Sequence, residues 1–361
     1  YNVISVGNIN DFNTTLRSEH VIYPNSSRGP TLGGRKKPDL GAPGRYIIST
    51  NNNWEGTGAD FVSYTGTSMA TPHVAGAAAL LGSRGVFNPM AVKALLINSA
   101  EDKGAIGWDE TYGWGYIDLD HLDFHVTDYF SASISAEPDY QLYAGPAYMG
   151  DNATLVWHRR LVYEAAVEPT TVYTLTNLDL IAYEELTNEV ITNSLSLIDN
   201  VEQVKFNADY SSAVIKVDSA SASIYGADAE RYALATEEGF SQRNGPSLVL
   251  YPIPSGNIQG PIGTIITMTV SVGNQGDLLA HQVQLGVETS AGINKLSGPN
   301  SPVDIGKLGL GGVSSQCIWT FQKTSDDQQY IRLTATSNSY GEIFSSSWEY
   351  RYSYYFPMVY K

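Results

Sequence analysis

Cysteine is almost missing from this sequence. A single Cys among 361 residues excludes an intramolecular disulfide framework. That residue, Cys317, lies in the segment Gln316-Cys317-Ile318-Trp319, which has the character of a strand. We therefore expect a buried thiol with no chemical role.

Long apolar runs are absent as well. No stretch of about 18 consecutive apolar residues occurs, which excludes a membrane-spanning helix of ordinary length. Signal-peptide and lipidation motifs are also missing. Because the chain starts at Tyr1 inside a strand-like segment, the missing signal peptide carries no conclusion about export.

Basic residues are scarce. There are 21 Lys and Arg against 37 Asp and Glu, and the formal net charge is −16. Nucleic acids and anionic membranes are therefore poor partners. A low charged fraction (16%), with 24 Tyr and 34 Gly, favours a secreted, strand-rich protein, so we expect an extracellular or cell-surface location. The length predicts two or three domains.

The most informative segment places a serine where a tight turn becomes an apolar helix. It runs Gly66-Thr67-Ser68-Met69-Ala70-Thr71-Pro72-His73-Val74-Ala75-Gly76 and continues as Ala77-Ala78-Ala79-Leu80-Leu81. The first backbone N–H groups of a helix are unpaired, and the helix dipole is positive there. This setting suits a nucleophile whose attack creates an oxyanion. The alternative is a small-residue core helix with Ser68 as its cap.

This segment resembles the nucleophile signature of the subtilisin-like serine peptidases, the subtilases. A second block supports the resemblance: Asn25-Ser26-Ser27-Arg28-Gly29-Pro30, followed by Gly34-Arg35-Lys36-Lys37-Pro38-Asp39-Leu40-Gly41-Ala42-Pro43-Gly44. The resemblance covers about the first third of the chain. It implies that Ser68 is the nucleophile, that its own N–H donates to the oxyanion, and that the Thr67 hydroxyl assists.

The rest of a subtilase active site is missing. That family places a catalytic Asp, a catalytic His and an oxyanion Asn before the serine. The 67 residues before Ser68 contain no Asp-Ser/Thr-Gly, His-Gly-Thr-His or Ala-Gly-Asn run, and His20 stands alone. His73 lies five residues past Ser68, about 140° around a helix, so we expect a structural role. The other histidines, His121, His125, His158 and His281, follow in strand-like or linker sequence.

We therefore expect a C-terminal fragment of a secreted subtilisin-like endopeptidase, with the Asp, His and Asn upstream of residue 1, and expect the chain alone to be inactive. Expected partners are protein or peptide substrates and the upstream half of the catalytic domain. The chemistry itself needs no cofactor. The alternative is a non-catalytic extracellular adhesion or binding protein that keeps a degenerate subtilase scaffold.

The first expected domain, 1–124, is the C-terminal half of a subtilisin-like α/β domain with a mostly parallel sheet. Strands are expected at Val3–Val6, Tyr46–Thr50 and Phe61–Tyr64. Asn88-Pro89 predicts the start of a second helix that runs to about Ala100. The helix over 74–81 is apolar on nearly all sides, so we expect much of its surface to be left uncovered by residues 1–124 alone.

Two all-β sandwich domains are expected to follow. Residues 127–243 contain short β-branched runs between polar turns and resemble the jelly-roll domains of bacterial secreted peptidases. Such domains sometimes bind structural Ca²⁺, for which Asp179 and Asp199 are candidates. We favour the alternative that both are turn or edge residues, because no dense loop of oxygen ligands is present.

The next block, 246–350, alternates at period two, as in Thr264–Val272, and resembles the immunoglobulin-like modules of bacterial surface proteins. The tail, 351–361, is rich in tyrosine. An ordinary aromatic edge strand is the favoured interpretation of this end of the chain, and contact with a polysaccharide or the cell surface is the alternative.

Overall fold

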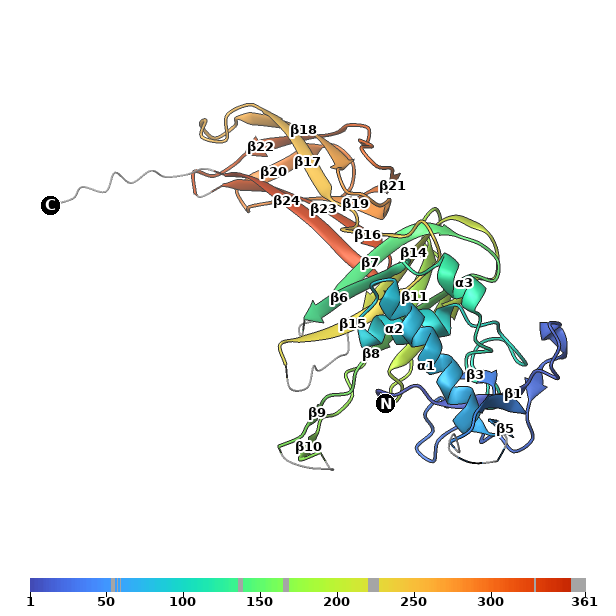
Figure 1. Cartoon of the computed structure of the whole chain (residues 1–361). Coiled ribbons are helices and arrows are strands. Elements are labelled where there is room, and N and C mark those ends of the chain that lie inside the picture. The colour runs from blue at the N-terminus through green and yellow to red at the C-terminus, as the bar shows by residue number, and fades with distance from the viewer. Residues whose placement is uncertain are drawn as a thin grey trace. The chain divides into compact units, whose positions relative to one another are not determined.

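The computed structural model describes residues 1–52, 56, 58, 60–135, 139–164, 169–219, 227–327 and 329–351. These fall into two compact units (Figure 1). The first holds residues 1–184 and 190–241, and the second holds residues 185–189 and 242–361.

The first unit begins with a small sheet of order β2-β1-β3. Strand β1 (Val6–Asn10) pairs in parallel with β3 (Leu40–Pro43) and antiparallel with β2 (Val21–Ile22), which follows a short 3₁₀ helix (Arg17–Glu19). The expected strand at Val3–Val6 is thus displaced toward the C-terminus. Only one of the two pairings is parallel, so the described sheet is not the mostly parallel one that was expected.

Helix α1 (Thr67–Ser83) buries one stripe and exposes the opposite face. Its buried residues, Ala70, Val74, Ala77 and Leu81, recur at the spacing of a single helical face. They pack into a core that also contains Ile9 and Leu40. On the opposite face, Leu80 is 57% exposed. This agrees with the expectation that residues 1–124 leave part of the helix uncovered.

Helix α2 (Pro89–Asn98) is buried on almost every side. Asn88 caps it by accepting a hydrogen bond from the Met90 N–H at 3.0 Å, and Pro89 occupies the first helical position, as the sequence predicts. The helix packs against strands β8 (Asn152–Trp157) and β15 (Ala229–Ala235). Residues 1–184 and 190–241 therefore share one compact unit, whereas separate domains at 1–124 and 127–243 were expected.

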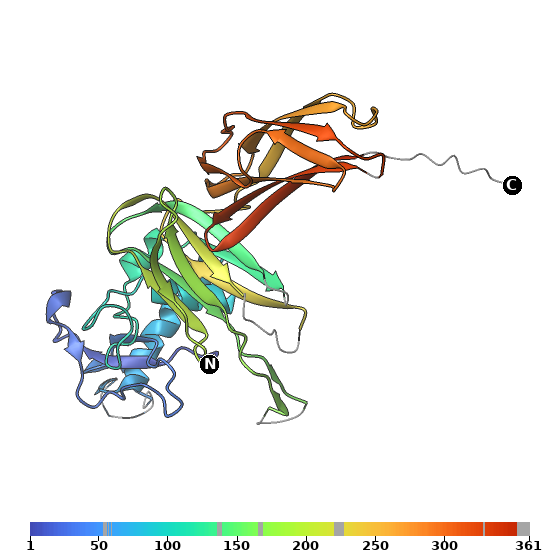
Figure 2. The same ribbon diagram turned by 180° about the vertical axis from the view of Figure 1, so that it is seen from behind.

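Two antiparallel sheets form the rest of this unit. One has the order β13-β8-β15-β6, with β6 (Tyr129–Ser135) and β13 (Val201–Lys205) at its edges. The other contains β12 (Val190–Ser194), β11 (Asp179–Glu184), β14 (Tyr210–Asp218) and β7 (Tyr140–Ala147) in that order. The sheets share a core, and the helices lie behind the four-stranded sheet in Figure 2.

Successive residues of β8 show how that four-stranded sheet is buried on both faces. Leu155 and Trp157 belong to the core between the two sheets, whereas Val156 belongs to the core that contains α2. Successive side chains of a strand point to opposite faces. The hydroxyls of Tyr143 on β7 and Tyr232 on β15 meet at 2.8 Å inside the core between the sheets.

Glu202 on β13 is fully buried and should make stability depend on pH. It accepts hydrogen bonds from the Ser196 N–H at 2.7 Å and from the Ser194 hydroxyl. Burial raises its pKa from 4.5 to about 7. Between these two pH values the folded state binds more protons than the unfolded state. The free energy of unfolding therefore falls as the pH rises from about 4.5 to about 7, by about 3 kcal/mol in total.

We expect Glu202→Gln, which is neutral at every pH, to remove this dependence. Urea unfolding of the full chain at pH 4 to 8 measures it. Glu164→Gln, at an exposed position, is the control and should follow the parent chain. If the stability of Glu202→Gln depended on pH in the same way as that of the parent chain, the pKa of Glu202 would not be raised by folding.

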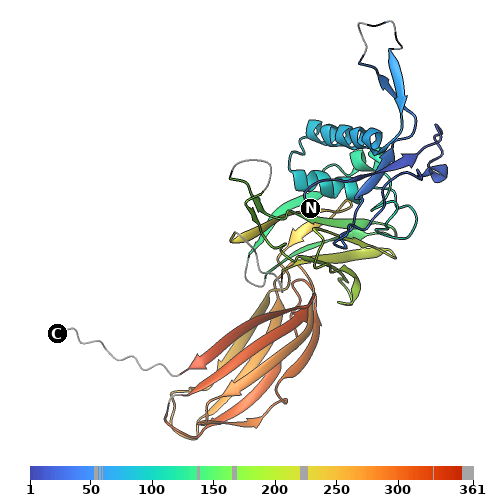
Figure 3. The same ribbon diagram turned by 90° about the horizontal axis from the view of Figure 1, so that it is seen from below.

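Four short strands complete the elements near this unit. β4 (Ile47–Thr50) and β5 (Phe61–Tyr64) pair as an antiparallel hairpin, and β9 (Leu161–Val162) pairs with β10 (Thr171–Val172). The β4–β5 hairpin, light blue in Figure 3, extends away from the rest of the first unit. β16 (Ser241–Arg243) spans the residues at which the two units divide.

The second unit is built from two further antiparallel sheets around one core. Their orders are β17-β18-β22-β20 and β21-β19-β23-β24. The strands are β17 (Leu248–Ser255), β18 (Ile265–Asn274), β19 (Ala280–Thr289), β20 (Ile293–Ser297), β21 (Val303–Leu308), β22 (Cys317–Lys323), β23 (Tyr330–Ser339) and β24 (Glu342–Arg351).

The period-two pattern of Thr264–Val272 agrees with strand β18, one face of which is inside. Ile266, Met268, Val270 and Val272 are all fully buried. Cys317 on β22 is half-buried rather than buried, and desolvation raises the pKa of its thiol. Little thiolate therefore forms at neutral pH, which agrees with a cysteine without a chemical role.

The jelly-roll and immunoglobulin-like assignments of 127–243 and 246–350 stay predictions. Of the aromatic tail, residues 352–361 lie outside the described residues, and Arg351 ends β24. None of the described helices has both the length and the apolar character that crossing a membrane would require.

Candidate functional site

Ser68 lies in the first turn of α1, directly after the N-cap residue Gly66 and Thr67. Its side chain is exposed. The Gly66 carbonyl accepts hydrogen bonds from the N–H groups of Met69 at 3.0 Å and Ala70 at 3.3 Å. Within the part of the chain that the structure describes, no acceptor is recorded for the Ser68 N–H. The hydroxyl and the N–H of one residue are thus both available at the positive end of a long helix.

Ser68 lines a hollow of about 330 Å³ between α1 and the β4–β5 hairpin. The hairpin contributes Ile47, Ser49 and Tyr64, and α1 contributes Met69, Pro72 and His73. None of the described residues that line it is an Asp, Glu, Lys or Arg.

None of the histidines that the sequence offers is placed as a base for Ser68. The His73 ring bonds the Met69 carbonyl one turn back in its own helix, at 2.9 Å. His20 is buried between the Thr14 carbonyl, at 3.0 Å, and the Tyr116 hydroxyl, at 3.3 Å. Across the described residues, no hydrogen bond or ion pair joins a histidine to the Ser68 hydroxyl.

Thr67 brings the two sequence motifs together. It lines a separate hollow of about 210 Å³, with Ser27, Arg28, Gly29 and Pro30 of the second motif. Thr67 is half-buried, and its carbonyl accepts a hydrogen bond from the Thr71 hydroxyl at 2.9 Å. Assistance to an oxyanion by its own hydroxyl stays a prediction.

Gly44 supports the turn that carries Ser68. Its carbonyl accepts a hydrogen bond from the Gly66 N–H at 2.8 Å. A Cβ at position 44 would lie 2.5 Å from Asn8 Oδ1, 2.7 Å from the Gly66 carbonyl oxygen and 3.0 Å from Ala70 Cβ. The backbone of the second motif can therefore approach the nucleophile turn this closely only with glycine at this position.

We expect Gly44→Ala to destabilise the chain by about 1–3 kcal/mol, because the turn and β1 must move apart to admit the methyl group. Urea unfolding of the full chain measures this effect. The control is Gly76→Ala on α1, where an added Cβ meets nothing within 4 Å. That change should stabilise by about 0.5–1 kcal/mol. Equal midpoints for the two variants would contradict the crowding at Gly44.

The two calcium candidates have protein partners of their own. Asp199 is buried and accepts hydrogen bonds from the Lys36 N–H at 2.8 Å and the Ser196 hydroxyl at 2.9 Å. Asp179 accepts one from the Asn177 side chain at 3.2 Å. Neither belongs to a metal-sized group of three His, Cys, Asp or Glu side chains among the described residues. Calcium binding stays a prediction.

Two histidines lie elsewhere than the sequence analysis expected. His121 is in helix α3 (Leu119–Phe124) and His125 is its C-cap residue, so neither is in a strand or linker. Both approach Glu237, which follows β15. The spacing of four residues between the histidines is a signal that could have suggested their convergence on one helical face.

Comparison with known proteins agrees with the motifs. The model of the subtilase family matches residues 1–115. The serine protease AprX of Bacillus subtilis is 37% identical over 129 residues, covering 33% of this chain and 29% of that protein. Pyrolysin of Pyrococcus furiosus is 50% identical over 80 residues, covering 21% and 6%.

An extracellular protease of Xanthomonas campestris is 48% identical over 66 residues, covering 17% of this chain and 11% of that protein. The chain spans less than a third of the length of each of these relatives. The segment matched by the family model contains both motifs and Ser68. Residues 1–115 of this chain are therefore similar to the subtilase family.

Proposed function

We propose that this chain is the C-terminal part of a secreted subtilisin-like serine endopeptidase, with Ser68 as its nucleophile. The catalytic Asp and His and the oxyanion Asn come from residues outside this sequence. The β-sheets that follow position the enzyme on its substrate or on the cell surface. The exposed Ser68, at the free N-terminus of α1 in a subtilase-family segment, is the observation that carries the proposal.

The geometry suits acyl transfer. The Ser68 hydroxyl attacks the peptide carbonyl while the histidine takes its proton, and the histidine then protonates the leaving amine. The Ser68 N–H, aided by the Thr67 hydroxyl and the absent Asn, donates to the oxyanion that forms. Water then hydrolyses the acyl-enzyme. The proposal assigns the hollow beside Tyr64 and Met69 to a substrate side chain.

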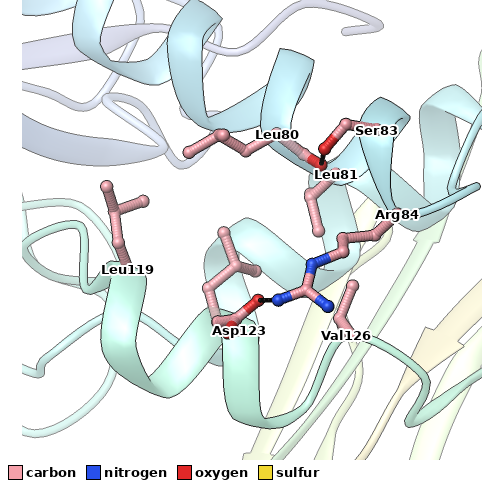
Figure 4. Close-up of a pocket in the computed structure, with 8 residues that line it drawn as sticks. Leu80, Leu81, Ser83, Arg84, Leu119, Asp123 and Val126 are labelled. Atoms are coloured by element: carbon pink, nitrogen blue, oxygen red, sulfur yellow. Dashed lines mark hydrogen bonds and ion pairs between the residues drawn. The ribbon is translucent and has the colours of Figure 1, made fainter.

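The exposed side of α1 supports the proposal that an additional protein segment packs against this helix. Near the C-terminal end of the helix, Leu80 and Leu81 face Leu119 of α3 across a third hollow of about 170 Å³ (Figure 4). The ion pair Arg84–Asp123, 2.5 Å between Nη2 and Oδ1, lies at its edge. Covering this apolar surface would favour association by about 25 cal/mol per Å² removed from water.

Reconstitution tests the proposal. The full chain is refolded with a subtilase segment that carries the Asp, His and Asn motifs, and the complex is treated with a fluorophosphonate probe. We expect labelling of Ser68 in the complex, none in Ser68→Ala, and full labelling in Ser49→Ala, whose hydroxyl lines the same hollow. A folded complex that leaves Ser68 unlabelled would defeat the proposal and favour the non-catalytic adhesion scaffold.

A further inference from the structure

Three potential metal ligands converge in the first unit, away from Ser68. They are His121 on α3, His125 at its C-cap, and Glu237 after β15. The Glu237 Oε2 atom lies 2.9 Å from His125 Nε2 and 3.3 Å from His121 Nε2. One donor atom from each residue lies within 4.8 Å of the others. The Glu237 and His125 side chains are only 8% and 11% exposed.

The other ring nitrogens of the two histidines are held by acceptors. His121 Nδ1 lies 3.2 Å from the Ser99 carbonyl oxygen, and His125 Nδ1 lies 2.9 Å from Asp128 Oδ2. A carbonyl and a carboxylate only accept hydrogen bonds, so each Nδ1 carries the proton. In both neutral rings, the Nε2 lone pair is then directed at Glu237. Such outer hydrogen bonds commonly orient metal-binding histidines.

This arrangement needs positive charge at its centre. Two neutral Nε2 lone pairs and a carboxylate oxygen repel one another at these separations. One cation between the three atoms would remove this repulsion. The Asn98 side chain donates to Glu237 Oε1 at 3.1 Å, which leaves Oε2 to face the rings.

We propose that His121 Nε2, His125 Nε2 and Glu237 Oε2 bind one divalent transition-metal ion of the Zn²⁺ class, with the fourth position open to water. Tetrahedral Zn²⁺ at about 2.0–2.1 Å from N and O ligands places those ligands about 3.3 Å apart. The observed 2.9 and 3.3 Å are close to that value. Two imidazoles favour such a metal over Ca²⁺ or Mg²⁺, which take oxygen ligands.

The ion would connect two distant parts of the first unit. His121 and His125 follow the family-matched segment, whereas Glu237 is 116 residues beyond His121 and follows the last strand of the four-stranded sheet. A bound metal would hold α3 on that sheet. The three ligands do not include Ser68, so this metal site does not depend on the nucleophile proposed above.

Metal titration of the untagged full chain tests the proposal. The chain is stripped with a chelator and titrated with Zn²⁺ against a chromophoric competitor, and Co²⁺ is used as a spectroscopic probe. We expect one bound equivalent, the intense visible absorption of tetrahedral Co²⁺, and a higher melting temperature with Zn²⁺. His121→Gln, His125→Gln and Glu237→Gln should each weaken binding by roughly 100-fold or more, and Asp128→Asn by about 10–100-fold.

His73→Gln is the matched control, because His73 is exposed and bonds only within its own helix. Its Zn²⁺ affinity should equal that of the parent chain. The proposal is overturned if the folded parent chain binds no Zn²⁺ equivalent, or if all three ligand variants keep its affinity. The Co²⁺ spectrum of the parent chain decides the matter even where a variant fails to fold.

Discussion

Replacing Ser68 by alanine is expected to lower kcat for peptide hydrolysis by the reconstituted complex roughly 10⁶-fold, the loss known for removal of the subtilisin nucleophile. Without the hydroxyl no acyl-enzyme can form, and only binding and oxyanion stabilisation remain. Steady-state hydrolysis of a chromogenic peptide measures this. KM should change little, because the hollow lined by Tyr64 and Met69 is kept.

Two comparisons make this result specific. Ser49→Ala, in the same hollow, should keep kcat within a few-fold of the parent complex. The chain without the added segment should show no hydrolysis, because no described histidine is placed to deprotonate Ser68. Robust hydrolysis by the chain alone, lost in Ser68→Ala, would show that a base within 1–361 serves the serine.

Replacing Asp39 by alanine should destabilise the chain by about 3–5 kcal/mol, because it leaves a buried cation without its partner. Asp39 lies in the second motif, and its side chain is 1% exposed. Oδ1 pairs with Lys93 Nζ of α2 at 3.0 Å, and Oδ2 pairs with Lys37 Nζ and accepts from the Ser5 N–H at 2.7 Å.

The Lys93 side chain is only 4% exposed, so water cannot replace the lost carboxylate. Desolvation by burial, followed by repulsion from Lys93, lowers the pKa of Lys37 to about 8 against the pull of Asp39. Urea unfolding at pH 7 measures the loss. The control is Asp123→Ala, which breaks the exposed pair with Arg84 and should cost about 0–1 kcal/mol. A similar loss of unfolding free energy in both variants would show that the buried ion pair contributes no more to stability than a surface ion pair.

Local pattern predicted several elements of the chain. The start of α2 follows from Asn88 and Pro89, since a cap and a first-position proline act within one turn. Strand β18 follows from strict alternation, because side chains of a strand point to opposite faces in turn. The expected strand at Val3–Val6 is displaced, because the pairing of Val6 with Leu40 on β3 sets its register.

Local pattern could not show that the residues on either side of position 124 belong to one compact unit. A run such as Ala153–Trp157 is apolar whether one or both faces of its sheet are covered. Only the packing of α2 against β8 and β15 shows that the second face is covered by a helix from the preceding segment. Jelly-roll and immunoglobulin-like topologies are likewise beyond local pattern. Each is defined by the order of its strands in the sheets, and local patterns do not encode that order.

The sequence by itself determined the segment proposed to carry the nucleophile and its resemblance to the subtilases, because Gly66 through Gly76 and the second motif are contiguous and their chemistry is local. The tertiary structure alone decided that Ser68 is exposed beside the β4–β5 hairpin, that Asp39 is buried with Lys93, and that His121, His125 and Glu237 meet. These side chains are distant in the chain, and the packing of helices on sheets brings them together.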